Sequence, residues 1–204
     1  MLKINKDAYS VSEEHYHPEV FEKSQIILAE SLRADHNHLV RLKNKDIGKT
    51  TEYPTYTIAR DGTIYQHFDP KFYSDFLGID SIDRHLISIS LENMGKLFFQ
   101  HDKEIYVNWC NEICPQDKVF HRDWKEFSYW EAHTTEQFYS LVKLCKWLCT
   151  EFNIVEDCIG FNFYNEETKY FKGIVCRGNY SYDYCDLNPS FPFRDFMEEM
   201  GIPV

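Results

Sequence analysis

The 204-residue sequence lacks several features that mark other classes of protein. It has no apolar run near the roughly 18 residues that a membrane-spanning helix needs, so we expect no membrane association. Residues 1–17 are polar and charged and contain no apolar core of a secretory signal, which predicts a cytoplasmic protein. No internal repeat, low-complexity segment or linker interrupts the chain, which predicts a single domain over residues 1–204.

Positive charge is also scarce. The sequence has 22 Lys and Arg residues against 33 Asp and Glu residues, for a formal net charge of −11. An acidic protein repels phosphate backbones, and the only basic run, residues 41–45, is short and typical of a solvated helix end. We therefore predict no nucleic-acid partner.

Cysteine is present, but not in the pattern of a disulfide framework. The seven cysteines are an odd number with irregular spacing, so we expect mostly reduced thiols. Cys110 and Cys114 have the spacing of half a structural zinc site, and no second close pair completes it. Cys145 and Cys149 fall on one apolar helix face, where packing in the core is the simpler interpretation.

Hydrophobic periodicity predicts strands mixed with helices. Short apolar or alternating runs predict four strands, at residues 24–31, 54–59, 63–68 and 86–92. Helical spacing predicts three helices, at residues 38–45, 134–152 and 194–200. Asp61 and Gly62 mark a hairpin turn, and Thr134 and Gln137 have the spacing of a capping box. The pattern predicts an α/β fold with a mixed sheet.

Two polar segments are candidate functional sites. Glu92 ends an alternating strand on the face that carries Ser88 and Ser90, where small neighbours leave room for a ligand beside a carboxylate able to act as a general base. A solvent-facing sheet edge explains that pattern equally well. Residues 173–193 form a loop rich in Tyr, Asn and Asp, a composition shared by functional loops and by ordinary loops that pack aromatic rings.

Four segments also follow a recognisable order. They are YTIARDGTIYQHFDP (56–70), HLISISLENMGKL (85–97), YWEAHTTEQFYSLVKLCKWLCTEFNI (129–154) and GIVCRGNYSYDYCDLNPSFPFRDF (173–196). Together they resemble the type 2 N-acetylmuramoyl-L-alanine amidases, zinc enzymes that share a fold with peptidoglycan-recognition proteins. The resemblance covers about residues 24–200 and implies a mixed central sheet flanked by helices, with a groove for the peptide stem of muropeptides. An insert at about residues 98–128 resembles that of phage and prophage members.

The resemblance also implies a zinc site, held in active members by two histidines and an aspartate or cysteine. The zinc-bound water attacks the amide between the muramoyl lactyl group and L-alanine, with a glutamate as base. In this sequence Ala29 occupies the first ligand position, and Cys176 or Arg177 occupies the second, depending on a one-residue gap. Asp186 matches the third ligand, and Glu92 matches the catalytic glutamate.

This substitution pattern disfavours a metal. Ala29 offers no ligand atom, and a unit charge on Arg177 at 4 Å from a dication, at an effective dielectric near 20, is repelled by about 8 kcal/mol. His36 or His38 is a substitute ligand only if it reaches back from beyond the strand end. We therefore expect no bound zinc and no other cofactor, and a pocket in which Arg177 lies beside Asp186 and Glu92.

Three functional interpretations follow. The favoured one is a relative that has lost zinc hydrolysis and binds a peptidoglycan fragment, another small molecule or a partner protein in the former catalytic groove, through Tyr56, Arg177, Asn179 and Asp186. The second is an active cell-wall amidase with a rebuilt zinc site and Glu92 as its base. The third is a phage structural or assembly protein that uses the fold as a scaffold. A phage or prophage origin, in the host cytoplasm or a virion, suits the insert.

Overall fold

The main sheet of the protein is mixed, as the sequence predicts. The computed structural model describes residues 2–44 and 51–204, and all statements below concern that part of the chain. Its larger sheet has the strand order β1-β4-β3-β5-β2-β11. The strands are β1 (Ile4–Asn5), β2 (Gln25–Glu30), β3 (Tyr56–Ile58), β4 (Ile64–Gln66), β5 (Leu86–Leu91) and β11 (Gly173–Cys176). Strands β3, β5, β2 and β11 are parallel to one another, and β4 is antiparallel to β3.

The central strands β2 and β5 are buried along their whole length. Such strands are covered on both faces, which explains why residues 25–30 read as a nearly continuous apolar run. One face carries Ile26 and Leu28 into the largest hydrophobic cluster. The other face carries Ile27, which packs with Val175 of β11 in a separate cluster. The sheet is therefore the middle layer of the molecule.

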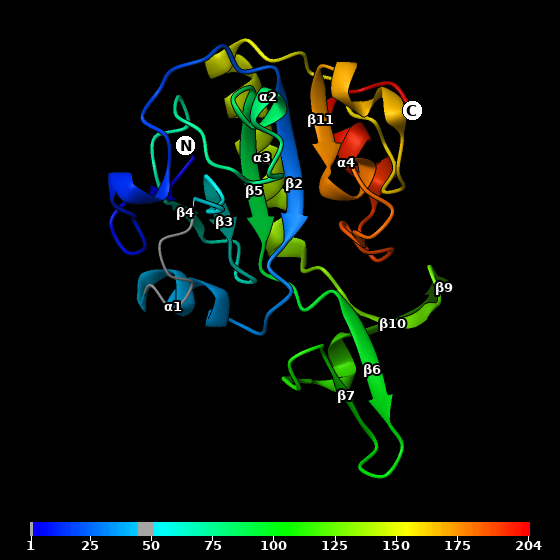
Figure 1. The fold of residues 1–204 in the computed structure, drawn as a ribbon. Helices are drawn as coiled ribbons and strands as arrows, with labels where there is room; N and C mark the ends of the chain where they lie inside the picture. Colours follow the sequence, from blue (N-terminus) through cyan, green and yellow to red (C-terminus); the bar gives the residue numbers. More distant parts are fainter. Residues whose placement is uncertain (1, 45–50) are drawn as a thin grey trace.

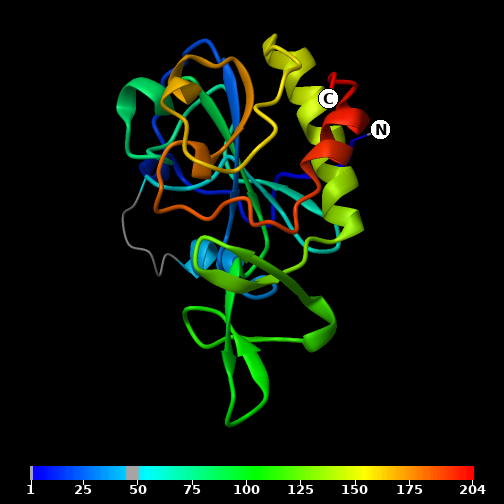
Figure 2. The same cartoon turned by 90° about the vertical axis from the view of Figure 1, so that its right-hand side faces the viewer.

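Helix α3 (Thr135–Phe152) covers one face of this sheet, together with α4 (Phe193–Met200). The predicted capping box is present in both directions, because the Thr134 side chain accepts from the Gln137 N–H and the Gln137 side chain accepts from the Thr134 N–H. Gln137 also donates to the carbonyl oxygens of Ile58 and Glu92, at 3.1 and 2.9 Å, which joins the start of the helix to the ends of β3 and β5. Figure 2 shows α3 and α4 together on one side of the sheet.

The other helices are short. They are α1 (Asn37–Asn44) and α2 (Asp80–Asp83). The described residues also form four 3-10 turns, η1 (Glu13–His15), η2 (Gln116–Lys118), η3 (Glu166–Tyr170) and η4 (Arg177–Asn179). The predicted helix at residues 38–45 corresponds to α1, and its last residue lies outside the described part of the chain. No helix of the described residues is long and apolar enough to cross a membrane.

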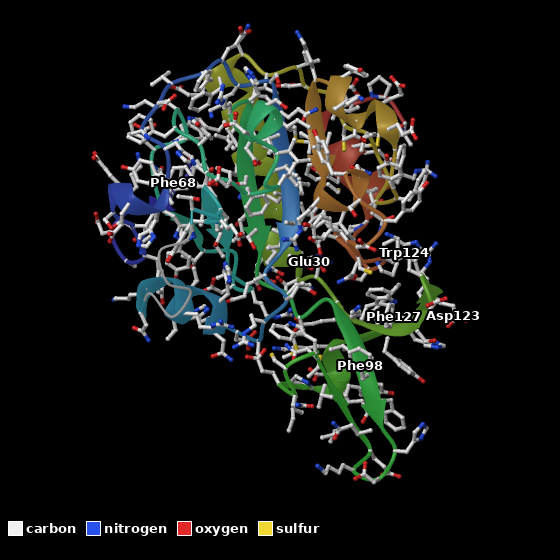
Figure 3. All side chains as sticks on the ribbon, in the orientation of Figure 1. Glu30, Phe68, Phe98, Asp123, Trp124 and Phe127 are labelled. Carbon is white, nitrogen blue, oxygen red and sulfur yellow. The ribbon has the colours of Figure 1, made fainter. Side chains whose placement is uncertain are left out.

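The insert forms an arm that projects from the body (Figure 1). It is an antiparallel sheet of order β8-β7-β6-β10-β9. Its strands are β6 (Lys96–Gln100), β7 (Ile105–Val107), β8 (Ile113–Cys114), β9 (Val119–Trp124) and β10 (Phe127–Glu131). The ring centroids of Phe98 and Phe127 are 6.0 Å apart. Figure 3 labels both residues on the arm. All seven cysteines are free thiols, whether in the arm or in the body.

Candidate functional site at the carboxyl ends of the parallel strands

Of the predicted site residues, the structure brings Arg177 and Asp186 together, in the segment that follows β11. Leu28 pairs with Cys176, so the next residues along these parallel strands, Ala29 and Arg177, are also neighbours. Ala29 pairs with Ser90 on the other side. Leu28 and Cys176 both lie in the main core, whereas Arg177 begins the 3-10 turn that directly follows β11. Arg177, and not Cys176, therefore has its side chain beside Asp186.

Arg177 forms a buried ion pair with Asp186. Its Nε donates to Asp186 Oδ2, and its Nη2 donates to the Glu30 carbonyl oxygen at 3.4 Å. The side chains are 17% and 2% exposed. The guanidinium carbon lies 4.7 Å from the ring centroid of Tyr184 and 5.9 Å from that of Phe76, so aromatic rings hold it in place.

Gly178 lets the two halves of this loop approach closely. Its N–H donates to the Asp186 carbonyl oxygen at 3.1 Å. A Cβ atom at this position would clash with that oxygen and would lie 2.8 Å from the carbonyl oxygen of Asn162. The absence of a side chain after Arg177 therefore allows the ion pair to form.

Glu92 lies in a different set of contacts. The Nδ1 atom of His36 is 3.0 and 3.1 Å from its two carboxylate oxygens, and the N–H groups of His36 and Arg60 also donate to the carboxylate. Glu92 is fully buried. Among the described residues no hydrogen bond or ion pair joins it to Arg177 or Asp186, so the expected three-residue pocket was wrong in this respect.

Two further histidines, His67 and His38, differ in burial, because His67 is buried and His38 is partly exposed. His67 uses both ring nitrogens, with Nε2 2.8 Å from Thr57 Oγ1 and Nδ1 2.8 Å from the Tyr9 carbonyl oxygen. The Nε2 atom of His38 is buried, and no described residue forms a hydrogen bond with it. Burial, with smaller effects from His67 and Arg177, lowers the pKa of His38 to about 3, so the ring is neutral near pH 7. Neither His36 nor His38 joins a metal-ligand set.

Tyr56 and Asn179 do not face accessible space. The Tyr56 side chain is fully buried in the main core, and its hydroxyl donates to Gln66 Oε1 at 3.4 Å. Asn179 is fully buried as well. Its amide donates to the carbonyl oxygens of Phe161 and Phe163 and accepts the Cys176 N–H at 2.7 Å, so its polar atoms hold the last loop together. The prediction that Tyr56 and Asn179 contact a ligand therefore conflicts with their buried positions.

The sequence analysis missed Glu30, which ends β2 beside the site (Figure 3). Its Oε1 accepts the Asn188 N–H at 2.9 Å and lies 3.2 Å from His133 Nε2. Burial, with a further contribution from Asp186, raises the pKa of this carboxyl well above its usual value. The sequence could have indicated this residue, because Glu30 is a carboxylate at the end of an otherwise apolar strand, and a charged group is rarely buried in such a place without partners.

The residues at the positions that the resemblance assigns to the zinc ligands do not fit a zinc ion. Ala29 offers no donor, Arg177 is a cation, and Asp186 is paired with that cation. In the described ranges, 2–44 and 51–204, no group of three or more His, Cys, Asp or Glu side chains is arranged to hold a metal. A catalytic zinc needs three protein ligands and an open position.

Comparisons with known proteins agree with this fold. The model of the N-acetylmuramoyl-L-alanine amidase family matches residues 14–164. The structure is similar to the amidase LysC from Clostridium intestinale (13% identity, all of both chains covered, TM-score 0.57) and to a mutant endolysin from Bacillus subtilis (16%, 98% and 100% covered, 0.54). It is also similar to AmiD from E. coli in complex with anhydro-N-acetylmuramic acid-L-Ala-D-gamma-Glu-L-Lys (12%, 92% of this chain and 61% of that chain, 0.57).

No curated protein sequence matches the chain. At these identities the similar structures establish the fold alone, and the family assignment comes from the sequence model, which spans most of the chain and ends before the Arg177–Asp186 loop. The chain therefore belongs to the N-acetylmuramoyl-L-alanine amidase family.

Proposed function

We propose that this protein is a metal-free member of the amidase family that binds a peptidoglycan fragment at the carboxyl ends of β2, β5 and β11 without hydrolysing it. The observation that carries the proposal is the Arg177–Asp186 ion pair. The resemblance to the zinc amidases assigns zinc-ligand positions to these two residues. An ion pair neutralises the aspartate that a metal would otherwise use, so the site is charge-balanced without zinc.

Competition between the arginine and a metal favours the arginine. For Asp186 to bind zinc, the guanidinium of Arg177 would have to leave the Asp186 carboxylate and its contacts with Tyr184 and Phe76. Its fixed positive charge would then lie beside the dication, and the repulsion would further weaken metal binding.

The chemistry of the site suits a carboxylate ligand. Arg177 is the one residue of the pair with appreciable exposure, and a guanidinium recognises carboxylates through paired N–H groups. Arg177 also acts electrostatically on His38, a neutral ring whose buried Nε2 has no hydrogen-bond partner among the described residues. The peptide named with AmiD, L-Ala-D-gamma-Glu-L-Lys, carries free carboxylates. A muropeptide of this kind is therefore the ligand class that we assign to the site.

Calorimetric titration with anhydro-N-acetylmuramoyl-L-Ala-D-gamma-Glu-L-Lys tests binding. We expect saturable binding, and we expect Arg177→Gln to weaken it at least tenfold, or about 1.4 kcal/mol. Arg194→Gln is the matched control, because Arg194 is an exposed arginine of α4 that is paired only with Glu198. Absence of binding by the folded wild-type protein would contradict the proposal and favour a scaffold role.

Hydrolysis is tested separately. Purified protein incubated with peptidoglycan should release no new L-Ala amino termini, with or without a chelator, and elemental analysis should find no stoichiometric zinc. Chelator-sensitive release, or one zinc per chain, would establish instead the active amidase with a rebuilt metal site.

A further inference from the structure

The connection between β2 and α1 separates the Glu92 carboxylate from solvent. We call residues 32–36 the cover segment. The side chain of His36 is 47% exposed, whereas Glu92, which the N–H and Nδ1 of His36 contact, is 0% exposed. Arg60, just after β3, donates its N–H to the same carboxylate at 3.2 Å. Access to Glu92 therefore depends on the position of the cover segment.

Both ends of the cover segment have an unfavourable backbone conformation. The φ angles of Leu32 and His36 are 58° and 56°, in the left-handed region that residues with a side chain rarely adopt. Such a conformation persists only where the surrounding structure holds it in place. The cover segment therefore depends on contacts with other parts of the molecule.

Glu112 of the arm supplies the main contact. It directly precedes β8, and its side chain is 17% exposed. Its Oε2 accepts the Ala34 N–H at 2.7 Å, and its Oε1 accepts the Asn37 amide at 2.8 Å and lies 3.5 Å from Arg33 Nε. Within the arm, the Asn108 amide donates to Oε2 at 2.7 Å and helps to fix the carboxylate. One carboxylate of the arm thus contacts both the cover segment and the first residue of α1.

Trp109 holds the other end of the cover segment. Its Nε1 donates to the Leu32 carbonyl oxygen at 2.8 Å. The guanidinium carbon of Arg33 lies 5.4 Å from the centroid of the Trp109 ring. Ala34 also packs against a hydrophobic cluster of the arm. The cover segment is therefore attached to the arm along its whole length.

We propose that the arm is an intramolecular latch, in which Glu112 and Trp109 hold the cover segment closed over Glu92 and loss of their contacts exposes the carboxylate. Both are positioning residues, because they act on Glu92 only through the cover segment. The cover segment is the two-state element that couples the arm to the carboxyl ends of the strands. The latch does not depend on muropeptide binding, because its contacts lie within the chain.

Glu112→Gln tests the latch with little change in side-chain size. Both oxygens of the Glu112 carboxylate accept N–H groups. A carboxamide accepts only through its oxygen, so its NH2 group would face the donors on one side, either those at Oε2 or those at Oε1. Donors that face each other without an acceptor favour release of the cover segment.

Hydrogen exchange measured by mass spectrometry, without ligand, reports the opening of the cover segment. We expect amide exchange in residues 32–37 to be roughly tenfold faster in Glu112→Gln, with the amides of β5 unchanged. Labelling of Glu92 by a water-soluble carbodiimide and glycine ethyl ester should accelerate by about the same factor, because both reactions need the open segment. Trp109→Phe keeps an aromatic ring and loses the hydrogen bond to Leu32, so we expect a smaller acceleration in the same residues.

Glu104→Gln is the matched control, because Glu104 is an exposed glutamate in the turn between β6 and β7 of the same arm. It should leave both rates at their wild-type values. Wild-type exchange in residues 32–37 of folded Glu112→Gln and Trp109→Phe would overturn the proposal. Equal acceleration throughout the protein, or unchanged labelling of Glu92 despite faster exchange, would overturn it as well. Failure of muropeptide binding would leave these rates unaffected, so the two proposals fail separately.

Discussion

Replacing Asp186 by asparagine tests whether the ion pair with Arg177 stabilises the loop that follows β11. The substitution keeps the size of the side chain and removes its charge. The guanidinium of Arg177 then stays beneath Tyr184 without a carboxylate partner. An unpaired buried charge destabilises the folded protein by more than an intact pair stabilises it, because the attraction to the partner no longer offsets the cost of desolvating the charge.

The burial of the ion pair sets the size of the expected loss in the free energy of unfolding. Removing one partner of a buried ion pair typically costs about 3–5 kcal/mol. Arg177 is 17% exposed, so water reaches part of the charge, and we expect the lower end, about 3 kcal/mol. For a chain of about 200 residues, 1 kcal/mol shifts the melting temperature by about 2–4 °C, so the expected decrease is about 6–12 °C.

Urea unfolding followed by circular dichroism measures this difference. The control is Arg194→Ala, which breaks the Arg194–Glu198 pair on α4, where the side chains are 77% and 54% exposed. That change should alter the free energy of unfolding by less than about 1 kcal/mol. Arg177→Met combined with Asp186→Asn should recover part of the loss, because no unpaired charge remains. A single Asp186→Asn variant as stable as the wild-type protein would refute the reasoning.

Three further predictions concern other parts of the molecule. Thr134→Ala should cost about 1 kcal/mol through loss of the helix cap. Gln137→Ala should cost more, about 2–3 kcal/mol, because the buried Glu92 carbonyl oxygen also loses its side-chain donor and the Ile58 carbonyl oxygen keeps only the Glu92 N–H; chemical denaturation of both variants gives the comparison. Gly178→Ala should displace the Asp186 loop and destabilise the protein more than the Thr134 substitution does, whereas equal melting temperatures would contradict the predicted clash. Burial lowers the pKa of Lys23 from 10.5 to about 8, so between these pH values the unfolded chain binds more protons than the folded protein. The free energy of unfolding of the wild-type protein, relative to that of Lys23→Met, should therefore rise as pH increases from about 8 to about 10. A decrease in that relative free energy over the same range would contradict the prediction.

Local patterns in the sequence were sufficient for most of the fold. The strand at residues 24–31 and the helix at residues 134–152 lie within one or two residues of β2 and α3. Thr134 and Gln137 form the expected capping box because capping depends on residues three positions apart, and such short-range chemistry is independent of the tertiary structure.

The site was less accessible to sequence reasoning, because it depends on contacts between distant segments. Tyr56 and Asn179 were predicted to contact a ligand, and both are buried by packing that no local pattern specifies. Glu92 was predicted to lie beside Arg177, but His36, which follows a different strand, covers its carboxylate. In both cases the deciding neighbour is far away in sequence.

The sequence by itself determined the alternation of strands and helices and the cap of α3. Only the tertiary structure decided that Arg177, and not Cys176, pairs with Asp186, and that His36 contacts the Glu92 carboxylate. The physical reason is the two-residue period of a strand: a shift of one residue exchanges the two faces of the sheet, and only pairing with the neighbouring strands fixes which face each side chain takes.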